Sequence, residues 1–153
     1  MCNFTQAKCV SLNISFASHL SHTRVVHKRI NILIVDDSSN MRRAIALAVK
    51  DIAGQIHECS DGSEALAAYA RHLPDLVLMD IRMKKIDGLT ATRKIKAVFP
   101  DAIVIVVSTC DGNDMKEAAR AAGASDYVAK DNLLELRQIL INRTDKKSQS
   151  IAA

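Results

Sequence analysis

Tryptophan is absent from this 153-residue sequence, and aromatic residues make up only 3% of it. A surface on which the bases of single-stranded nucleic acid could stack is therefore not expected. The hydrophobic core must instead come from isoleucine, leucine, valine, methionine and alanine side chains. The length suits one domain that buries a core of its own, and a second folded module is not expected.

Cysteine motifs and long apolar runs are missing as well. The four cysteines are Cys2, Cys9, Cys59 and Cys110, without CxxC spacing and without a set of histidines around them. This pattern argues against a disulfide or zinc framework and favours a reducing compartment, so we expect a cytoplasmic protein. No apolar run approaches the roughly 18 residues that a membrane-spanning helix needs, and membrane insertion is not expected.

Acidic residues are missing from residues 1–29, which contain four basic residues. The other 17 basic residues of the chain are matched by its 17 acidic residues, so the formal net charge of +4 belongs to this segment. Direct DNA binding by the rest of the chain is therefore not expected. We interpret residues 1–29 as a disordered N-terminal extension. A later translation start near Val25 or Val26 and an organelle-targeting segment are the alternatives.

From Ile30 onward, short apolar runs alternate with amphipathic stretches. The apolar runs predict strands at 30–35, 56–59, 76–79, 103–107 and 127–129. Start and stop signals predict helices at about 39–54, 62–74, 88–100, 112–122 and from 131 onward. The second strand is the most polar and is expected at an edge. Regular alternation of strand and helix predicts an α/β fold with a doubly wound sheet.

Each predicted helix carries apolar residues at helical spacing, which we expect to face the core. In chain order they are Met41, Ala44, Ile45, Ala48, Val49 and Ile52, then Ala65, Leu66, Tyr69 and Leu73, then Ala91, Ile95, Val98 and Phe99, then Met115, Ala118, Ala119 and Ala122, and finally Leu133, Leu136 and Leu140. Gly54 is expected to end the first helix.

The residues with the most reactive chemistry directly follow the predicted strands. In chain order they are Asp36, Asp37, Asp80, Ser108, Thr109 and Lys130. The carboxyl ends of parallel strands share one edge of a sheet, and ligand sites form in the crevice outside it. Three carboxylates, two hydroxyls and one ammonium should therefore converge.

Three clustered carboxylates would raise one another's pKa unless a cation neutralises them. Mg²⁺ is the natural candidate for Asp36, Asp37 and Asp80, because it is a hard ion that prefers oxygen ligands and keeps several waters. A carboxylate such as Asp80 can also attack an activated phosphoryl group and form an acyl phosphate. As isolated features, the same residues would be interpreted as helix caps, turn formers and solvated charges.

Four motifs resemble the receiver domain of two-component response regulators, over roughly residues 29–143. They lie at residues 35–38, at 79–83 with 87–89, at 107–109 and at 123–130. The resemblance implies a flavodoxin-like (βα)5 sandwich whose five-stranded parallel sheet has the order 2-1-3-4-5. It places a stand-alone, chemotaxis-regulator-like receiver domain at 30–143 and a C-terminal tail at 144–153. Lys84, Thr109 and Asp131 differ from the commonest receiver sequence, but none of them removes a reacting group.

The resemblance also implies roles for the site residues. Asp80 would be the phosphoacceptor, and Asp37 and Asp80 would bind Mg²⁺ directly. Asp36 would act on the ion mainly through water, and the backbone carbonyl of Arg82 would be a further ligand.

Other residues would bind the phosphoryl oxygens or report their presence. Lys130 would offer its ammonium group, and the Ser108 hydroxyl and the Thr109 N–H would reach the remaining oxygens. Tyr127 would turn inward when Ser108 is drawn toward the phosphoryl group.

The function implied by the resemblance is that of a phosphorelay switch. Asp80 would receive its phosphoryl group from a histidine kinase or a phosphotransfer protein, and the domain would help to catalyse its own phosphorylation and dephosphorylation. A downstream effector would bind the face formed by the fourth helix, the fifth strand and the fifth helix, at about 113–143.

Three other functions remain as alternatives. The first is an adaptor or dimerisation module that has the receiver fold but is not phosphorylated. The second is a flavodoxin-like electron carrier, which Asp36 and Asp37 disfavour because they would repel a cofactor phosphate. The third is a haloacid-dehalogenase-type phosphatase, which would need an Asp-x-Asp motif after the first strand.

Overall fold

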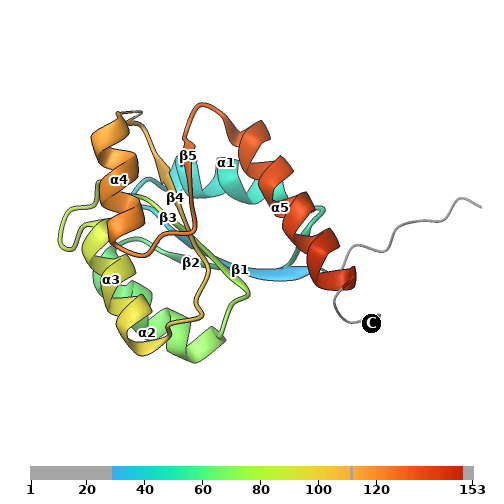
Figure 1. Cartoon of the computed structure of the whole chain (residues 1–153), viewed down its shortest axis with the longest axis horizontal. Helices are drawn as coiled ribbons and strands as arrows, with labels where there is room; N and C mark the ends of the chain where they lie inside the picture. The colour runs from blue at the N-terminus through green and yellow to red at the C-terminus, as the bar shows by residue number, and fades with distance from the viewer. Residues whose placement is uncertain (1–28, 111, 150–153) are drawn as a thin grey trace, which may run out of the picture.

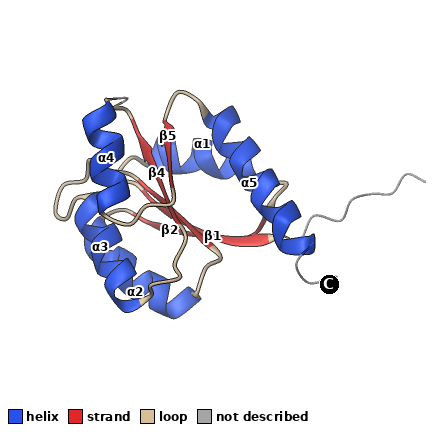
Figure 2. Ribbon diagram, in the orientation of Figure 1, coloured by secondary structure: helices blue, strands red, loops and turns tan. Residues whose placement is uncertain are grey.

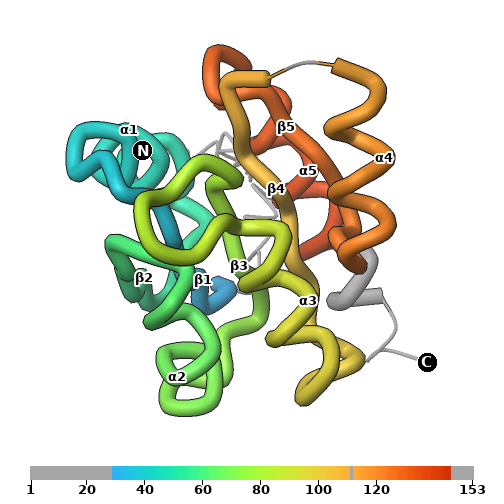
Figure 3. The backbone as a smooth tube through the Cα atoms, turned by 90° about the vertical axis from the view of Figure 1, so that its left-hand side faces the viewer, coloured from blue at the N-terminus to red at the C-terminus, as the bar shows by residue number. Residues whose placement is uncertain are grey.

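The computed structural model describes residues 29–110 and 112–149 of the chain. Within this part, five strands alternate with five helices, and the strands form one parallel sheet of order β2-β1-β3-β4-β5. The strand labels follow this order from left to right in Figure 3. The predicted α/β class, flavodoxin-like topology and edge position of the second strand are confirmed. The predictions for residues 1–28 lie outside the described residues.

The elements have the following bounds. The strands are β1 (Ile30–Val35), β2 (Ala53–Cys59), β3 (Leu76–Met79), β4 (Val104–Ser108) and β5 (Asp126–Ala129). The helices are α1 (Ser39–Val49), α2 (Gly62–His72), α3 (Gly88–Val98), α4 (Asn113–Ala121) and α5 (Leu133–Gln149). Helices α1 and α5 cover one face of the sheet, and α2, α3 and α4 cover the other (Figures 1 and 2).

The central strands bury both of their faces, as expected for a sheet covered by helices on each side. Side chains alternate along β1, so that Ile32 and Ile34 pack toward α1 and α5, whereas Leu33 packs with residues of α2 and α3. All three side chains are fully buried. Leu136 and Leu140 of α5 are also fully buried, and each burial contributes about 2 kcal/mol to folding. The core thus fixes the strand ends on which the polar residues lie.

Side-chain caps start the two helices that follow the loops after β1 and β3. Ser38 accepts a hydrogen bond from the Met41 N–H at the start of α1, and Asp87 accepts one of 2.9 Å from the Thr90 N–H at the start of α3. Such caps satisfy N–H groups that have no partner inside the helix. The caps therefore hold the ends of these two loops at the starts of α1 and α3.

Four details of the sequence prediction differ from the structure. Helix α1 ends at Val49, and Gly54 lies inside β2, because the Ile30 N–H already bonds the Ile52 carbonyl and strand pairing starts there. Leu73 is exposed because the C-cap of α2 adopts a left-handed conformation (φ 42°). Val98 is exposed because it lies beside the stripe through Ile95. Helix α5 continues to Gln149, past the predicted domain boundary at 143.

Asp61 connects the start of α2 to the loop that precedes α3. Its carboxylate accepts hydrogen bonds from the Ser63 N–H (2.8 Å) and the Lys85 N–H (2.9 Å). The bond from Ser63 is the main reason that the pKa of Asp61 falls from 3.8 to about 2. Because the folded-state pKa lies below the unfolded value, the ionised group stabilises the fold above pH 3.8, and this contribution is lost as the pH falls toward 2.

We expect Asp61→Ala to lower the free energy of unfolding at pH 7 and to make it less dependent on pH between 4 and 2. Urea denaturation at a series of pH values measures both effects. Replacement of the exposed Asp101 by alanine is the matched control and should change neither. An Asp61→Ala profile parallel to that of the wild type would contradict this assignment.

None of the helices in the described residues combines the length and the hydropathy needed to cross a lipid bilayer.

Candidate functional site

Strand register brings the polar residues together at the carboxyl edge of the sheet. Val35 pairs with Met79, so that Asp36 and Asp80, the next residue of each strand, lie side by side. The Asp80 N–H donates a hydrogen bond of 2.8 Å to the Val35 carbonyl. Ser108 likewise pairs with Ala129, and the Lys130 N–H donates to the Ser108 carbonyl at 2.8 Å. The predicted convergence is therefore present.

The carboxylates of Asp36, Asp37 and Asp80 form one cluster. Each offers an oxygen, and these oxygens lie within 4.8 Å of one another. Asp36 and Asp80 are buried, at 1% and 4% exposure, whereas Asp37 is exposed. Among the residues that the structure describes, no other group of three acidic, histidine or cysteine side chains could hold a metal ion. An all-oxygen donor set with one side open to water suits Mg²⁺.

Lys130 supplies the positive charge within this cluster. Its ammonium group lies 2.7 Å from Asp36 Oδ2 and 3.1 Å from Asp80 Oδ1, and its side chain is only 10% exposed. The buried Asp36 Oδ2 has this charge partner but no hydrogen bond of good geometry. One ammonium against three carboxylates leaves two formal negative charges. The residues therefore fit a divalent cation.

The electrostatics make the ionised form of Asp80 costly. Burial raises its pKa, Asp36 adds to this effect, and Lys130 opposes it through a hydrogen bond and its charge. For Lys130 itself, burial lowers the pKa, but the bonds to Asp36 and Asp80 outweigh it and the net shift is upward. A cation beside Asp80 would lower the pKa of its carboxyl and keep the nucleophile ionised.

The loop after β4 connects the other predicted site residues. Ser108 is buried, and its hydroxyl accepts a hydrogen bond of 3.2 Å from the Cys110 N–H. The Tyr127 hydroxyl donates to the Cys110 carbonyl. From the loop after β3, the Arg82 guanidinium donates to Thr109 Oγ1 (3.1 Å) and to Cys110 Sγ (2.7 Å). The structure thus brings Thr109 and Tyr127 into one network beside the acidic cluster, while their roles, and that of the Arg82 carbonyl, stay predictions.

Two residues that shape the site, Gly88 and Arg42, have no predicted role in the sequence analysis. Gly88 packs against the backbone of Asp80, where a Cβ atom would lie 1.8 Å from the Asp80 carbonyl oxygen. Arg42 donates a hydrogen bond of 2.7 Å to the Asp36 carbonyl oxygen. The motif around Gly88 was visible in the sequence, but its close approach to Asp80 was not. For Arg42, the sequence offered no signal beyond its place on a polar helix face.

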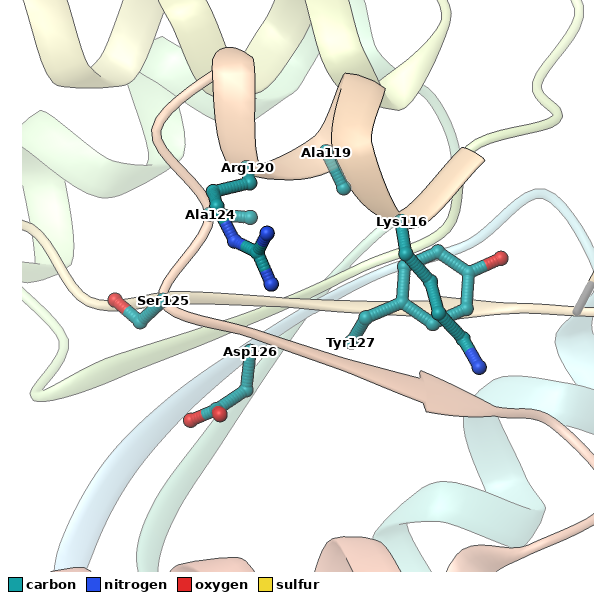
Figure 4. Close-up of a pocket in the computed structure, with 7 residues that line it drawn as sticks. All are labelled: Lys116, Ala119, Arg120, Ala124, Ser125, Asp126 and Tyr127. Atoms are coloured by element: carbon teal, nitrogen blue, oxygen red, sulfur yellow. The ribbon is translucent and has the colours of Figure 1, made fainter. Parts of the chain in front are cut away.

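A hollow lies on the outer surface of α4 and β5. It is lined by Lys116, Ala119, Arg120, Ala124, Ser125, Asp126 and Tyr127 (Figure 4). The Lys116 ammonium lies 5.9 Å from the centre of the Tyr127 ring, and the two side chains lie next to each other in Figure 4. The hollow therefore shares Tyr127 with the network beside the acidic cluster.

Comparison with known proteins connects this geometry to one family. The model of the response regulator receiver domain matches residues 32–141. The chain is 39% identical to chemotaxis protein CheY of Bacillus subtilis over 118 residues, which cover 74% of this chain and 95% of CheY. It is 40% identical to response regulator GacA of Pseudomonas aeruginosa over 108 residues, which cover 69% of this chain but only half of GacA.

Solved structures agree with this match. A two-component response regulator of the LuxR family from Aurantimonas sp. SI85-9A1 superposes with a TM-score of 0.73 at 27% identity, covering 78% of this chain and 87% of that one. The CheX-CheY-BeF3-Mg complex from Borrelia burgdorferi has a TM-score of 0.65 at 28% identity, with 71% and 86% coverage.

Proposed function

This chain belongs to the response regulator receiver domain family, and we propose that it acts as a switch by accepting a phosphoryl group on Asp80. The donor would be a phosphohistidine of a histidine kinase or of a phosphotransfer protein. The observation that carries the proposal is the position of the buried Asp80 carboxylate, which lies beside two further carboxylates and the Lys130 ammonium. A carboxylate in this setting is a suitable nucleophile for an activated phosphoryl group.

In the proposed reaction, an oxygen of Asp80 attacks phosphorus while the bond to the donor nitrogen breaks, and the histidine leaves with the electron pair of that bond. Lys130, now 3.1 Å from Asp80 Oδ1, would pair with a phosphoryl oxygen. The Ser108 hydroxyl and the Thr109 N–H would donate to the others. Mg²⁺, held by Asp36, Asp37, Asp80 and the Arg82 carbonyl, would neutralise charge on the transferred group.

Phosphorylation would then change how the chain binds a protein effector. The position of Tyr127 supports this step, because its hydroxyl bonds the loop after β4 and its side chain lines the hollow on α4 and β5. Movement of Ser108 toward a phosphoryl group would pull on Cys110, whose carbonyl holds the Tyr127 hydroxyl. We place the effector on the face formed by α4, β5 and α5.

Intact-mass measurement tests the proposal. The protein is incubated with Mg²⁺ and acetyl phosphate, in parallel with Asp80→Asn. A gain of one phosphoryl group by the wild type alone is the expected result, because the amide cannot form an acyl phosphate. Thr109→Ala serves as a second variant, since a branched side chain at the site could exclude the donor. If the wild type and Thr109→Ala both stay unmodified, the proposal is wrong and the adaptor hypothesis takes its place.

A further inference from the structure

Arg42 makes two strong hydrogen bonds beside the acidic cluster. Its Nη1 donates to the Asp36 carbonyl oxygen and its Nε donates to Glu58 Oε2, each at 2.7 Å. Only 17% of the Arg42 side chain is exposed, against 44% for Glu58. The guanidinium therefore joins α1, the end of β1 and the edge strand β2.

The carbonyl that Arg42 holds belongs to the peptide unit between Asp36 and Asp37. The Asp36 carboxylate is fixed by other contacts as well, since it accepts a hydrogen bond from the Ser38 N–H (2.8 Å) and pairs with Lys130. The exposed Asp37 carboxylate has no hydrogen bond or ion pair with another described residue. Its direction depends on the orientation of its backbone, which this peptide unit sets.

We propose that Arg42, oriented by Glu58, is a positioning residue that aims the Asp37 carboxylate at the divalent cation. The inference rests on the proposed function, because it assumes that the acidic cluster binds a cation. Groups that orient metal ligands without touching the ion typically change metal affinity by about 10-fold to 100-fold when they are removed. Without Arg42, the 36–37 peptide unit could rotate, and Asp37 would have to be ordered by the ion itself.

Arg43 provides a matched control for the charge of Arg42. It is the next residue of α1, it is exposed, and it has no hydrogen bond or ion pair with another described residue. Arg43→Ala therefore removes the same charge without touching the peptide unit. Arg42→Lys is the complementary variant, because it keeps the charge but loses the planar fork that bonds two acceptors at once.

Binding of Mn²⁺, a probe that takes the same oxygen ligands as Mg²⁺, tests the proposal by titration calorimetry on the folded proteins. We expect the Kd for Mn²⁺ to rise about tenfold in Arg42→Ala and nearly as much in Arg42→Lys. It should rise less in Glu58→Gln and stay at the wild-type value in Arg43→Ala. Phosphorylation of Arg42→Ala by acetyl phosphate should approach the wild-type rate at saturating Mg²⁺, because only cation binding is weakened. If Arg42→Ala folds poorly, the Kd for Mn²⁺ of Glu58→Gln still tests the proposal.

Three results would overturn the proposal. A wild-type Kd in Arg42→Ala and Glu58→Gln would mean that the contacts are merely structural. An equal loss in Arg43→Ala would mean that the effect does not come from the hydrogen bonds of Arg42, and full affinity in Arg42→Lys would mean that the planar fork is not needed. Failure of the wild type itself to bind Mn²⁺ would remove the proposed metal site and this inference together. The first two results would leave phosphorylation at Asp80 untouched.

Discussion

Replacement of Gly88 by alanine is expected to slow phosphorylation at Asp80 by about 100-fold, the cost that a misplacement of about 1 Å can have at a reacting group. The added Cβ would lie 1.8 Å from the Asp80 carbonyl oxygen and 2.7 Å from its carbonyl carbon. Both are backbone atoms and cannot move away alone, while the Gly88 N–H is held by the Ile81 carbonyl at 2.9 Å. The segment that carries Asp80 must therefore shift.

The change should also lower the free energy of unfolding by about 1–3 kcal/mol, as overpacking does elsewhere. Phosphorylation rates with acetyl phosphate, measured under conditions where each variant is folded, separate the two effects. Gly62→Ala is a useful comparison, because its Cβ would lie 2.5 Å from the Ile86 carbonyl oxygen, and its nearest contacts are atoms of Ile86 and Ala91 instead of Asp80. Gly112→Ala, which meets nothing within 4 Å, should be close to the wild type. A wild-type rate in Gly88→Ala would show that the contact does not position Asp80.

Removal of the Lys130 ammonium should slow phosphorylation without weakening cation binding. In Lys130→Ala, we expect phosphorylation to slow by about 100-fold, because one preorganised donor to the developing charge is lost. The affinity for Mn²⁺ should stay the same or increase, because Asp36 and Asp80 lose the ammonium that now neutralises them at 2.7 Å and 3.1 Å.

The two quantities are measured on the same protein samples, by mass spectrometry after timed reaction and by calorimetry with Mn²⁺. The exposed Lys94 on α3 offers a control of equal charge, and Lys94→Ala should change neither quantity. Weaker Mn²⁺ binding in Lys130→Ala would indicate that the ammonium organises the cluster instead of competing with the cation.

Much of the fold could be predicted because buried parallel strands appear in the sequence as short, nearly continuous apolar runs. The apolar run at 30–35 became β1 with the same bounds, and the polar second strand was found at the edge. The errors arose where tertiary contacts outweighed a local signal. Gly54 resembles a helix stop, but pairing with β1 extends β2 through it. Leu73 continues the helical period of α2, but a left-handed cap turns it outward.

The residues of the site likewise include some that the sequence could predict and others that it could not. The acidic cluster with Lys130 followed from residues placed directly after strands, which the topology then brings to one edge. Gly88 and Arg42 were missed as site residues, because their effect depends on distances to the backbone of Asp80 and Asp36. Such distances arise from how the loops pack and have no counterpart in residue spacing.

Location of the phosphoryl group is the most direct test of the central proposal. Borohydride reduces an aspartyl phosphate to homoserine, so that peptide mapping of the phosphorylated and reduced protein identifies the acceptor by its change in mass. We predict homoserine at position 80 and at no other position. Homoserine at Asp36 or Asp37, or a borohydride-resistant phosphate on Ser108 or Thr109, would contradict the assignment of Asp80 as the phosphoacceptor.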